Sequence, residues 1–355
     1  MTLRAQIAGL ILQDGPMRLC DYMSNCLLHP TLGYYTTRDP LGAAGDFITA
    51  PEISQMFGEL IGLSLAQSWL DQGSPAPFTL AELGPGRGTL MADVLRATRS
   101  VPGFHAAARL ILIEASPTLR AAQRRLLQPF APQWVDMASD LPEQPLFAIA
   151  NEFFDALPIR QFLRVGTGWR ERLVGLEGED LVVGLGNPAP HPDLSHRLAD
   201  TKDGDLVETC APALSVIAAL GQRIAGHGGA ALIVDYGDWH SLGDTLQALK
   251  GHKSAGILDD PGQADLTAHV DFEALAQAAT ATGCAHSRLT TQGVFLDRLG
   301  ITARAQALSK GRNDTDVATI TSAHRRLTHP EEMGNLFKVL GLYPAQANSL
   351  PGLTS

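Results

Sequence analysis

Short apolar runs alternate with amphipathic stretches from residue 78 onward. The apolar runs are FTLAELG, ARLILIEAS, LFAIANEFF and GGAALIVDYG. Apolar residues at helical spacing occupy the stretches between them, namely TLMADVLRAT, PTLRAAQRRLLQPF and APALSVIAALGQRIAG. Because buried strands that are joined by helices pair in parallel, this alternation predicts an α/β sheet.

The first 75 residues follow a different pattern. Leu3, Ile7, Leu10 and Ile11 are spaced as on one face of a helix, and EISQMFGELIGLSLAQSWL has the same period. Between these two stretches, HPTLGYYTTRDPLGAAGDFITAPEIS is rich in Gly, Pro and Thr and predicts a long loop. Loops of this length in a compact domain are usually functional or disordered, and its aromatic residues argue against disorder. We therefore expect an N-terminal helical and lid region over residues 1–75.

Residues 159–187 interrupt the α/β pattern. They contain three short apolar stretches separated by GTG and EGED, which predict a β-meander. We expect residues 159–204 to be an insertion into one α/β domain that spans residues 76–158 and 205–345. Residues 237–268 predict a polar, Gly-rich loop, and EMGNLFKVL predicts a terminal helix or strand that packs in the core.

Composition excludes several classes of function. The 355 residues carry a formal net charge of −10, which disfavours broad binding of the phosphate backbone, and so no nucleic-acid partner is expected. The four cysteines form no CxxC pair and no histidine lies at zinc-finger spacing, so we expect a reducing compartment and no metal site. The N-terminus lacks a secretion signal, and no apolar stretch is long enough to span a membrane. Oligomeric state is left open.

The most specific motif is AELGPGRGTL, where Gly84, Gly86 and Gly88 follow a predicted strand and precede a predicted helix. Glycine lets the backbone turn sharply and approach a ligand, and the helix N-terminus adds free N–H groups. A dinucleotide fingerprint, GxGxxG, would need glycine where Thr89 stands, and the P-loop lysine is absent. With Glu82 two residues before the first glycine, the motif resembles motif I of class I S-adenosylmethionine (SAM) methyltransferases.

Glu114 ends the next predicted strand, 28 residues after Gly86. A carboxylate at this position can accept hydrogen bonds from both ribose hydroxyls of an adenosine. NAD-binding folds use the same arrangement, so Glu114 supports a nucleoside more than it selects SAM.

Further segments resemble one family, the MidA-type SAM-dependent methyltransferases, whose mitochondrial members are complex I assembly factors. The matching segments are LHPTLGYYTT, GDFITAPEISQMFGELIG, AELGPGRGTLMADVLR, IEASPTLRAAQ, ANEFFDALPIRQF, LIVDYG, DLTAHVDFEAL and MGNLFKVL. The resemblance implies a Rossmann-like class I methyltransferase sheet with an N-terminal helical extension and a β-meander insertion. It implies SAM as cofactor and protein arginine methylation, because the mitochondrial members are known for symmetric dimethylation of a complex I core subunit; the number of methyl groups and the target of this chain are left open. The chain begins with the family's first helix and without an Arg- and Ser-rich extension, so we expect a bacterial-type, cytoplasmic protein.

Guanidinium methylation requires carboxylates that hold the planar group, and the matching segments supply acids. ANEFFDALP offers Glu152 and Asp155 as guanidinium contacts and Asn151 as a contact to the cofactor or the substrate. LIVDYG offers Asp235 and LTAHVDF offers His269 as further catalytic candidates. The alternative is that Asp155 and Asn151 only cap or turn the chain, and that His269 is structural.

Two other segments are candidate cofactor contacts. GDFITAPEIS offers Asp46, Thr49, Pro51 and Glu52, either as a lid over SAM and the substrate, with Glu52 catalytic, or simply as a helix start with Pro51 in its first turn. Asp136 and Met137 follow the second helix of the α/β pattern, where the equivalent turn in related methyltransferases reaches the adenine.

Three functions remain open on sequence grounds. The first is a SAM-dependent protein arginine methyltransferase that acts on a protein with an accessible arginine. The second is a methyltransferase-derived assembly chaperone without turnover, and the third is an NAD-linked dehydrogenase, against which Thr89 argues.

Overall fold

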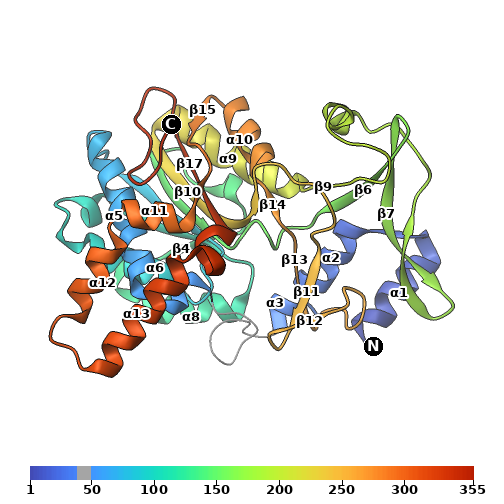
Figure 1. Cartoon of the computed structure of the whole chain (residues 1–355), viewed down its shortest axis with the longest axis horizontal. Coiled ribbons are helices and arrows are strands. Elements are labelled where there is room, and N and C mark those ends of the chain that lie inside the picture. Colours follow the sequence, from blue (N-terminus) through green and yellow to red (C-terminus); the bar gives the residue numbers. More distant parts are fainter. Residues whose placement is uncertain (38–48) are drawn as a thin grey trace.

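The computed structural model describes residues 1–37 and 49–355, and a nine-stranded sheet lies at its centre (Figure 1). The order of its strands is β15-β17-β10-β5-β2-β3-β4, with β14 paired to β10 and β16 paired to β17. The bounds are β2 Phe78–Leu83, β3 Ala108–Ile113, β4 Gln133–Val135, β5 Leu146–Asn151, β10 Gly229–Asp238, β14 Val270–Asp271, β15 Cys284–His286, β16 Thr290–Thr291 and β17 Phe337–Pro344.

The central strands β4, β3, β2, β5 and β10 pair in parallel, as the apolar runs predicted, whereas β17 is antiparallel to both β10 and β15. This order is that of the class I methyltransferase fold, and it confirms the predicted fold class. The chain leaves β2 toward β3 on one side and returns to β5 on the other. Ligands bind outside the carboxyl ends of strands at such a switch point.

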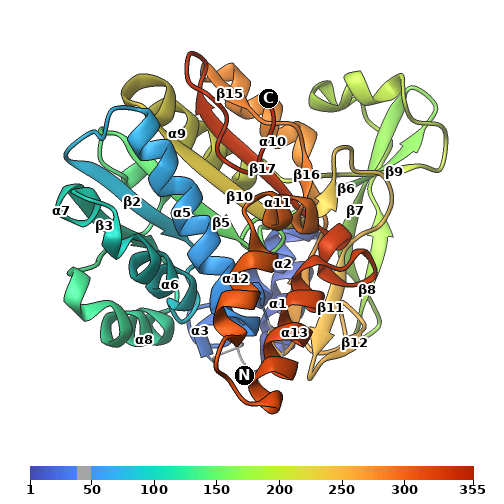
Figure 2. The same cartoon turned by 60° about the vertical axis from the view of Figure 1, so that its left-hand side comes forward.

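Helices cover both faces of this sheet (Figure 2). Along β2 and β5, apolar side chains belong to two different clusters, which explains why these strands are mostly apolar and buried on both faces. One face packs against α5 (Gln55–Asp71), α6 (Thr89–Ala97), α11 (Gln292–Arg298), α12 (Ile301–Ser309) and α13 (Asp314–Thr328). The other face packs against α9 (Ala211–His227) and α10 (Phe272–Ala281).

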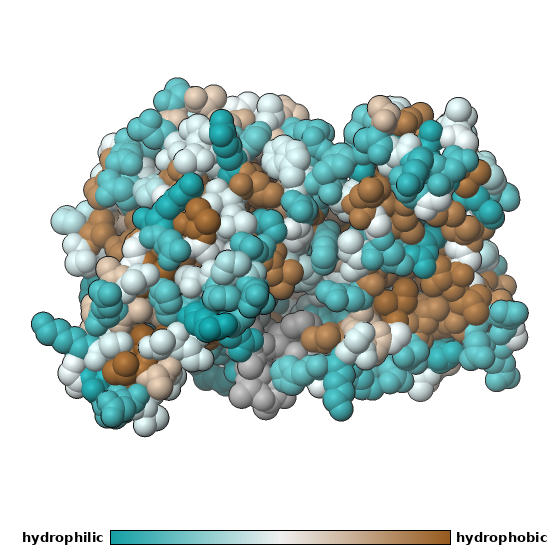
Figure 3. All heavy atoms as spheres, in the orientation of Figure 1, coloured by the Kyte–Doolittle hydropathy of each residue, from teal (hydrophilic) through white to brown (hydrophobic). Residues whose placement is uncertain are grey.

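A second group of elements packs beside the central sheet. The sheet β1-β7-β6-β9, with β8 paired to β7, and the three-stranded sheet β12-β11-β13 share an apolar cluster with the N-terminal helices. The bounds are α1 Leu3–Asp14, α2 Leu19–Leu28, β1 Met17–Arg18, β6 Arg160–Val165, β7 Gly168–Glu177, β8 Asp180–Leu185, β9 Leu206–Thr209, β11 Gln247–Lys250, β12 Lys253–Ala255 and β13 Asp265–Thr267. Figure 3 shows apolar side chains gathered over α1 and β7 on this side of the molecule.

Several local predictions from the sequence differ from the structure. The predicted loop over residues 237–268 contains the three strands β11 to β13. Leu10 lies outside the buried face of α1, with 41% of its surface exposed. The helix predicted from Glu52 onward is interrupted, because α4 (Ala50–Ile53) ends at Ser54, whose side chain then caps α5. The division into residues 1–75, 159–204 and the remainder stays a prediction, and α5 packs on the central sheet and not with α1 and α2.

Candidate active site

The glycine turn after β2 lies at the switch point. Gly84, Gly86 and Gly88 have φ values of 61°, 53° and 88°, in the left-handed region that other residues avoid. A Cβ on Gly84 would lie 3.0 Å from the ring of Phe153, so space as well as conformation excludes a side chain there. Gly88 is the N-cap residue of α6. The bare backbone of this turn lines a cavity of about 760 Å³ through Gly84 and Gly86.

Glu114 reaches the same cavity from the end of β3. Its Oε1 accepts a hydrogen bond from the backbone N of Ser116 (2.8 Å), and its Oε2 accepts one from Nε2 of Gln123 (3.1 Å). Burial raises the pKa of Glu114, whereas these donors lower it. Gln123 is a functional candidate that we missed. Its Nε2 also donates to the carbonyl of Gly86 (2.7 Å), and its Oε1 accepts from Trp134 (2.8 Å), so it joins the glycine turn to Glu114.

Two buried acceptors beside the glycine turn have no hydrogen-bond donor within the described part of the chain. They are Oε2 of Glu82 and Oδ1 of Asn151. Both residues line a small cavity of about 60 Å³ that also touches Gly84 and Gly86. Burial raises the pKa of Glu82 to about 8. An ammonium group would supply the missing donors, and the amino-acid end of SAM carries one. The residues present therefore fit this cofactor.

The small cavity is also lined by three residues that we assigned to the lid, namely Thr49, Pro51 and Glu52. Pro51 lies in the first turn of α4, after Thr49 as the N-cap residue. Oε1 of Glu52 accepts a hydrogen bond from Oγ1 of Thr89 (2.6 Å), which joins α4 to the start of α6. Glu52 does not line the larger cavity. Asp46, which we also assigned to the lid, lies outside the described residues.

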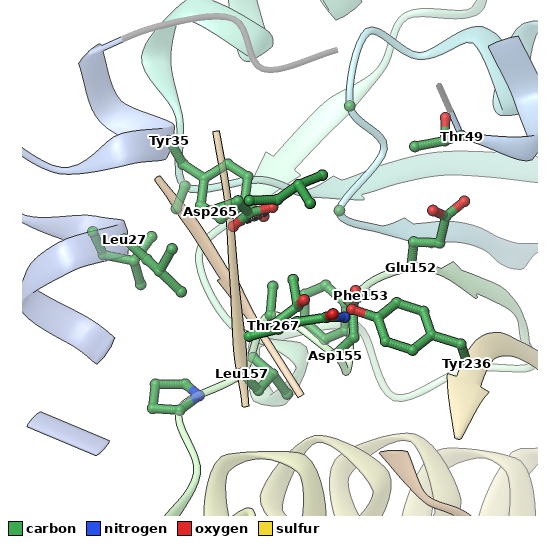
Figure 4. A pocket seen from close by; sticks show the side chains of 18 of the residues that line it. Leu27, Tyr35, Thr49, Glu152, Phe153, Asp155, Leu157, Tyr236, Asp265 and Thr267 are labelled. Carbon is green, nitrogen blue, oxygen red and sulfur yellow. Dashed lines mark hydrogen bonds between the residues drawn. The ribbon is translucent and has the colours of Figure 1, made fainter. Parts of the chain in front are cut away.

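The turn after β5 presents carboxylates to the larger cavity. Glu152 and Asp155 both line it (Figure 4). Oε1 of Glu152 accepts hydrogen bonds from the backbone N of Ala50 (3.3 Å) and from Nδ2 of Asn151 (3.0 Å). Burial, with the charge of Asp155, raises the pKa of Glu152 to about 7, and burial raises that of Asp155 to about 6. Both groups therefore change charge close to neutral pH.

Asp235 lies at the end of β10 but does not line either cavity. Its Oδ2 accepts hydrogen bonds from the backbone N of Phe153 (3.2 Å), Phe154 (2.9 Å) and Asp155 (3.3 Å). Complete burial and the neighbouring carboxylates raise its pKa, while the backbone donors oppose the rise. The structure thus places Asp235 beneath the turn that carries Glu152 and Asp155, with no surface toward a substrate.

Hydroxyl groups bond to carboxylates on both sides of the cavity, and the pair Tyr35 and Asp265, opposite Glu152, was not assigned from the sequence. The hydroxyl of Tyr236 hydrogen-bonds with Asp155 and Thr267, and that of Tyr35, in α3 (Tyr34–Thr37), donates to the Asp265 carboxylate at 2.9 Å. Figure 4 shows Tyr35 and Asp265 on one side of the space and Glu152 with Thr49 on the other. Tyr35 and Asp265 are 230 positions apart, so no local pattern could have paired them.

The remaining candidates from the sequence are His269, Asp136 and Met137, which differ in whether they line the larger cavity. His269 lines the cavity with its ring edge-on to Tyr236, at 5.4 Å between ring centroids. Asp136 lines it from the end of β4 and pairs with Arg120 at 2.6 Å, although its own side chain is largely exposed. Met137 is 61% exposed and does not line the cavity. Within residues 1–37 and 49–355, no group of three or more His, Cys, Asp or Glu side chains could hold a metal ion.

Comparison with known proteins agrees with this site. Residues 60–290 match the family model described as "Putative S-adenosyl-L-methionine-dependent methyltransferase". The chain belongs to this family. A solved structure of a protein from Burkholderia thailandensis, bound to S-adenosyl-homocysteine, is 28% identical and covers 99% of this chain and 94% of its own, with a TM-score of 0.86. The SAM-dependent activity and the predicted cofactor are thereby confirmed.

Curated relatives are similar over nearly the whole chain. The protein arginine methyltransferase NDUFAF7, mitochondrial, of Danio rerio is 37% identical over 94% of this chain and 84% of its own length. The human protein of the same name is 35% identical over 95% of this chain and 82% of its own. Our expectation of a bacterial-type cytoplasmic protein is wrong, because these relatives are named as mitochondrial. No helix in the described residues is long and apolar enough to cross a membrane.

Proposed function

We propose that this methyltransferase transfers a methyl group from SAM to a guanidinium nitrogen of an arginine in a protein. The observation that carries the proposal is the pair of carboxylates, Glu152 and Asp155, on the turn that lies beside the glycine loop and faces the same cavity. A planar guanidinium has five N–H donors, and carboxylates are the groups that bind it most specifically. The names of the curated relatives support the same substrate class.

The cofactor would be held by residues of both cavities. Gly84 and Gly86 offer a backbone without side chains, Glu114 faces the cavity where ribose hydroxyls need an acceptor, and Glu82 with Asn151 offers acceptors to the ammonium group. Thr49, Pro51 and Glu52 close the small cavity from the α4 side. When bound, SAM supplies an electrophilic methyl group on a sulfonium sulfur.

The chain's own residues orient the nucleophile and take up a proton. With SAM bound, the nitrogen lone pair would form the new N–C bond as the C–S bond broke and left its electron pair on sulfur. The guanidinium then loses one N–H proton, which passes to Glu152 or Asp155. A general base is most effective when its pKa lies near the working pH, and the pKa of Glu152, about 7, meets that condition.

Labelled-methyl transfer tests the proposal. Purified protein is incubated with methyl-labelled SAM and with arginine peptides or the same peptides carrying lysine, and the products are identified by mass spectrometry. The complex I core subunit expected from the family resemblance is the first whole protein to try. We expect label on arginine only, and Glu152→Gln should reduce kcat at least about 100-fold while SAM still binds. Glu179→Gln, on the exposed turn between β7 and β8, is the matched control and should retain full activity.

Two results would contradict the proposal. Label on lysine or on a small molecule would reject the guanidinium, and equal loss in both variants would reject the role of Glu152. If SAM binds and no peptide or extract protein accepts label, the chaperone without turnover becomes the better interpretation.

A further inference from the structure

Asp235 is the most completely enclosed carboxylate near the site. None of its surface is exposed, and backbone N–H groups surround it. Oδ2 accepts from Phe153, Phe154 and Asp155, and Oδ1 accepts from Tyr236 at 2.9 Å. Each hydrogen bond to Asp235 within the described residues comes from a backbone N–H group, so both carboxyl oxygens act as acceptors.

The segment that wraps around this carboxylate is the one that carries the proposed guanidinium contacts. Glu152 has φ of 51°, a left-handed conformation that is unfavourable for a residue with a side chain. Such a conformation persists only where the surroundings determine it. The backbone N of Glu152 donates to the carbonyl of Val234 at 2.9 Å, and the carbonyl of Asp155 accepts from Ala268 at 2.9 Å. These two contacts hold the ends of the turn, and Asp235 holds its middle.

We propose that Asp235 is a positioning residue for methyl transfer: by binding the backbone N–H groups of residues 153–155, it fixes the direction in which Glu152 and Asp155 enter the cavity. This inference rests on the proposed function, because it gives those two side chains their role. It also explains why a carboxylate at the end of β10 lies beneath the turn and does not line the cavity. Asp235 acts through the turn and touches neither cofactor nor substrate.

Both acceptor oxygens of Asp235 are required. An asparagine would keep one acceptor oxygen, but its NH₂ group would then face a backbone N–H, either that of Tyr236 or those of the turn. One or more buried N–H groups would lose their acceptor, which loosens the turn. A displacement of about 1 Å at the reacting groups can lower the rate about 100-fold without touching the cofactor.

The test compares Asp235→Asn with Glu208→Gln, a buried carboxylate of the β6–β9 sheet. Glu208 also accepts several hydrogen bonds, from Gln161 at 2.6 Å and from the backbone N of Thr245 at 3.0 Å, and it lines neither cavity. We expect Asp235→Asn to bind SAM within about threefold of wild type, because the glycine turn and Glu114 are unchanged, while kcat falls about 100-fold. Glu208→Gln should change stability alone.

Several outcomes would overturn the inference. Asp235→Asn could lose SAM affinity in step with kcat, could lose no more kcat than Glu208→Gln, or could keep residues 152–155 in place in a crystal structure. The crystal structure decides the point even if wild-type protein methylates no arginine, so failure of the proposed function is a separate result. If Asp235→Asn does not fold, amide hydrogen exchange of wild-type protein is the second measurement. The amides of residues 153–155 should be strongly protected, and exchange at the rate of an open loop would refute the inference.

Discussion

The buried side chain of Gln123 joins the glycine turn to Glu114. It donates to Gly86 and to Glu114 and accepts from Trp134, so its replacement by leucine removes one hydrogen bond from each of these three residues, although Glu114 keeps the one from Ser116. Each unsatisfied buried group costs about 1–3 kcal/mol, and a tenfold change in affinity corresponds to about 1.4 kcal/mol. We predict that Gln123→Leu raises the SAM dissociation constant at least about tenfold, as measured by calorimetric titration.

The control for that prediction is another buried glutamine. Gln292, on α11, is also fully buried and donates to the carbonyl of Leu327, away from both cavities. Gln292→Leu should lower stability and leave SAM affinity unchanged. Equal affinities in the two variants would show that the link between Gly86 and Glu114 has no part in binding.

The two carboxylates of the turn give a directional prediction about pH. Each must be ionised to accept guanidinium N–H groups, and burial raises the pKa of Asp155 to about 6 and that of Glu152 to about 7. The active form is therefore lost as pH falls, and kcat should rise between about pH 5.5 and 7.5 and then level off. A pH–rate profile under saturating SAM checks this. In Glu152→Gln the upper part of the rise should disappear, and a flat wild-type profile would contradict the role of both groups.

At the scale of elements, α4 is the connection between the N-terminal part of the chain and the glycine turn. Thr89 donates to Glu52, and the backbone N of Ala50 donates to Glu152, so α4 contacts both the proposed cofactor site and the proposed guanidinium site. Thr89→Val keeps the shape and removes the donor. We predict a SAM dissociation constant about five- to tenfold higher, by titration, because the hydrogen bond to the charged carboxylate of Glu52 is lost.

Thr319→Val is the matched control, since Thr319 is exposed on α13 and its hydroxyl bonds only within the helix. It should bind SAM like wild type. If Thr89→Val does the same, α4 does not contribute to the cofactor site through this contact.

The sequence correctly predicted the elements whose apolar pattern extends over many consecutive residues. The long parallel strands β2, β3, β5 and β10 are mostly apolar, because both faces of the sheet are covered, and each is bounded by a polar or glycine-rich turn. Strands β11 to β13 were missed because QALK, KSA and DLT are short and mostly polar, and only their pairing with one another makes them strands. The direction of Asp235 was also beyond local reasoning. In a strand buried on both faces, the pattern places a residue at the end of the sheet but does not fix which side its carboxylate faces.

The residues of the candidate site also fall into two groups, those that local motifs predicted and those that only the fold reveals. Gly84, Gly86 and Glu114 belong to contiguous motifs whose spacing carries the chemistry, and all three line the cavity. Only tertiary packing brings three further residues to the cavity or its lining residues, namely Gln123, Tyr35 and Asp265. Gln123 lies within an ordinary amphipathic helix. Tyr35 meets Asp265 on one side of the cavity, although 230 positions separate them in the sequence.

At the scale of the whole molecule, the buried carboxyl groups of the site make the free energy of unfolding depend on pH and on cofactor binding. Their pKa values, about 8 for Glu82, 7 for Glu152 and 6 for Asp155, lie above the ordinary values. A carboxyl group whose pKa is raised by folding stabilises the native state fully below its unfolded pKa, and this contribution is lost as pH rises through the folded value. The ligand-free protein should therefore lose stability between about pH 5 and 8.

Bound cofactor should reverse part of that loss, because its ammonium group pairs with ionised Glu82. The rise in melting temperature on adding S-adenosyl-homocysteine is therefore predicted to grow from pH 6 to pH 8.5, as measured by thermal scanning at fixed ligand excess. In Glu82→Gln the ligand-free protein should lose less stability across this range, and the shift should be smaller and nearly constant. A ligand-induced shift in wild-type protein that does not change with pH would mean that Glu82 does not meet the ammonium group, and the small cavity would then need another occupant.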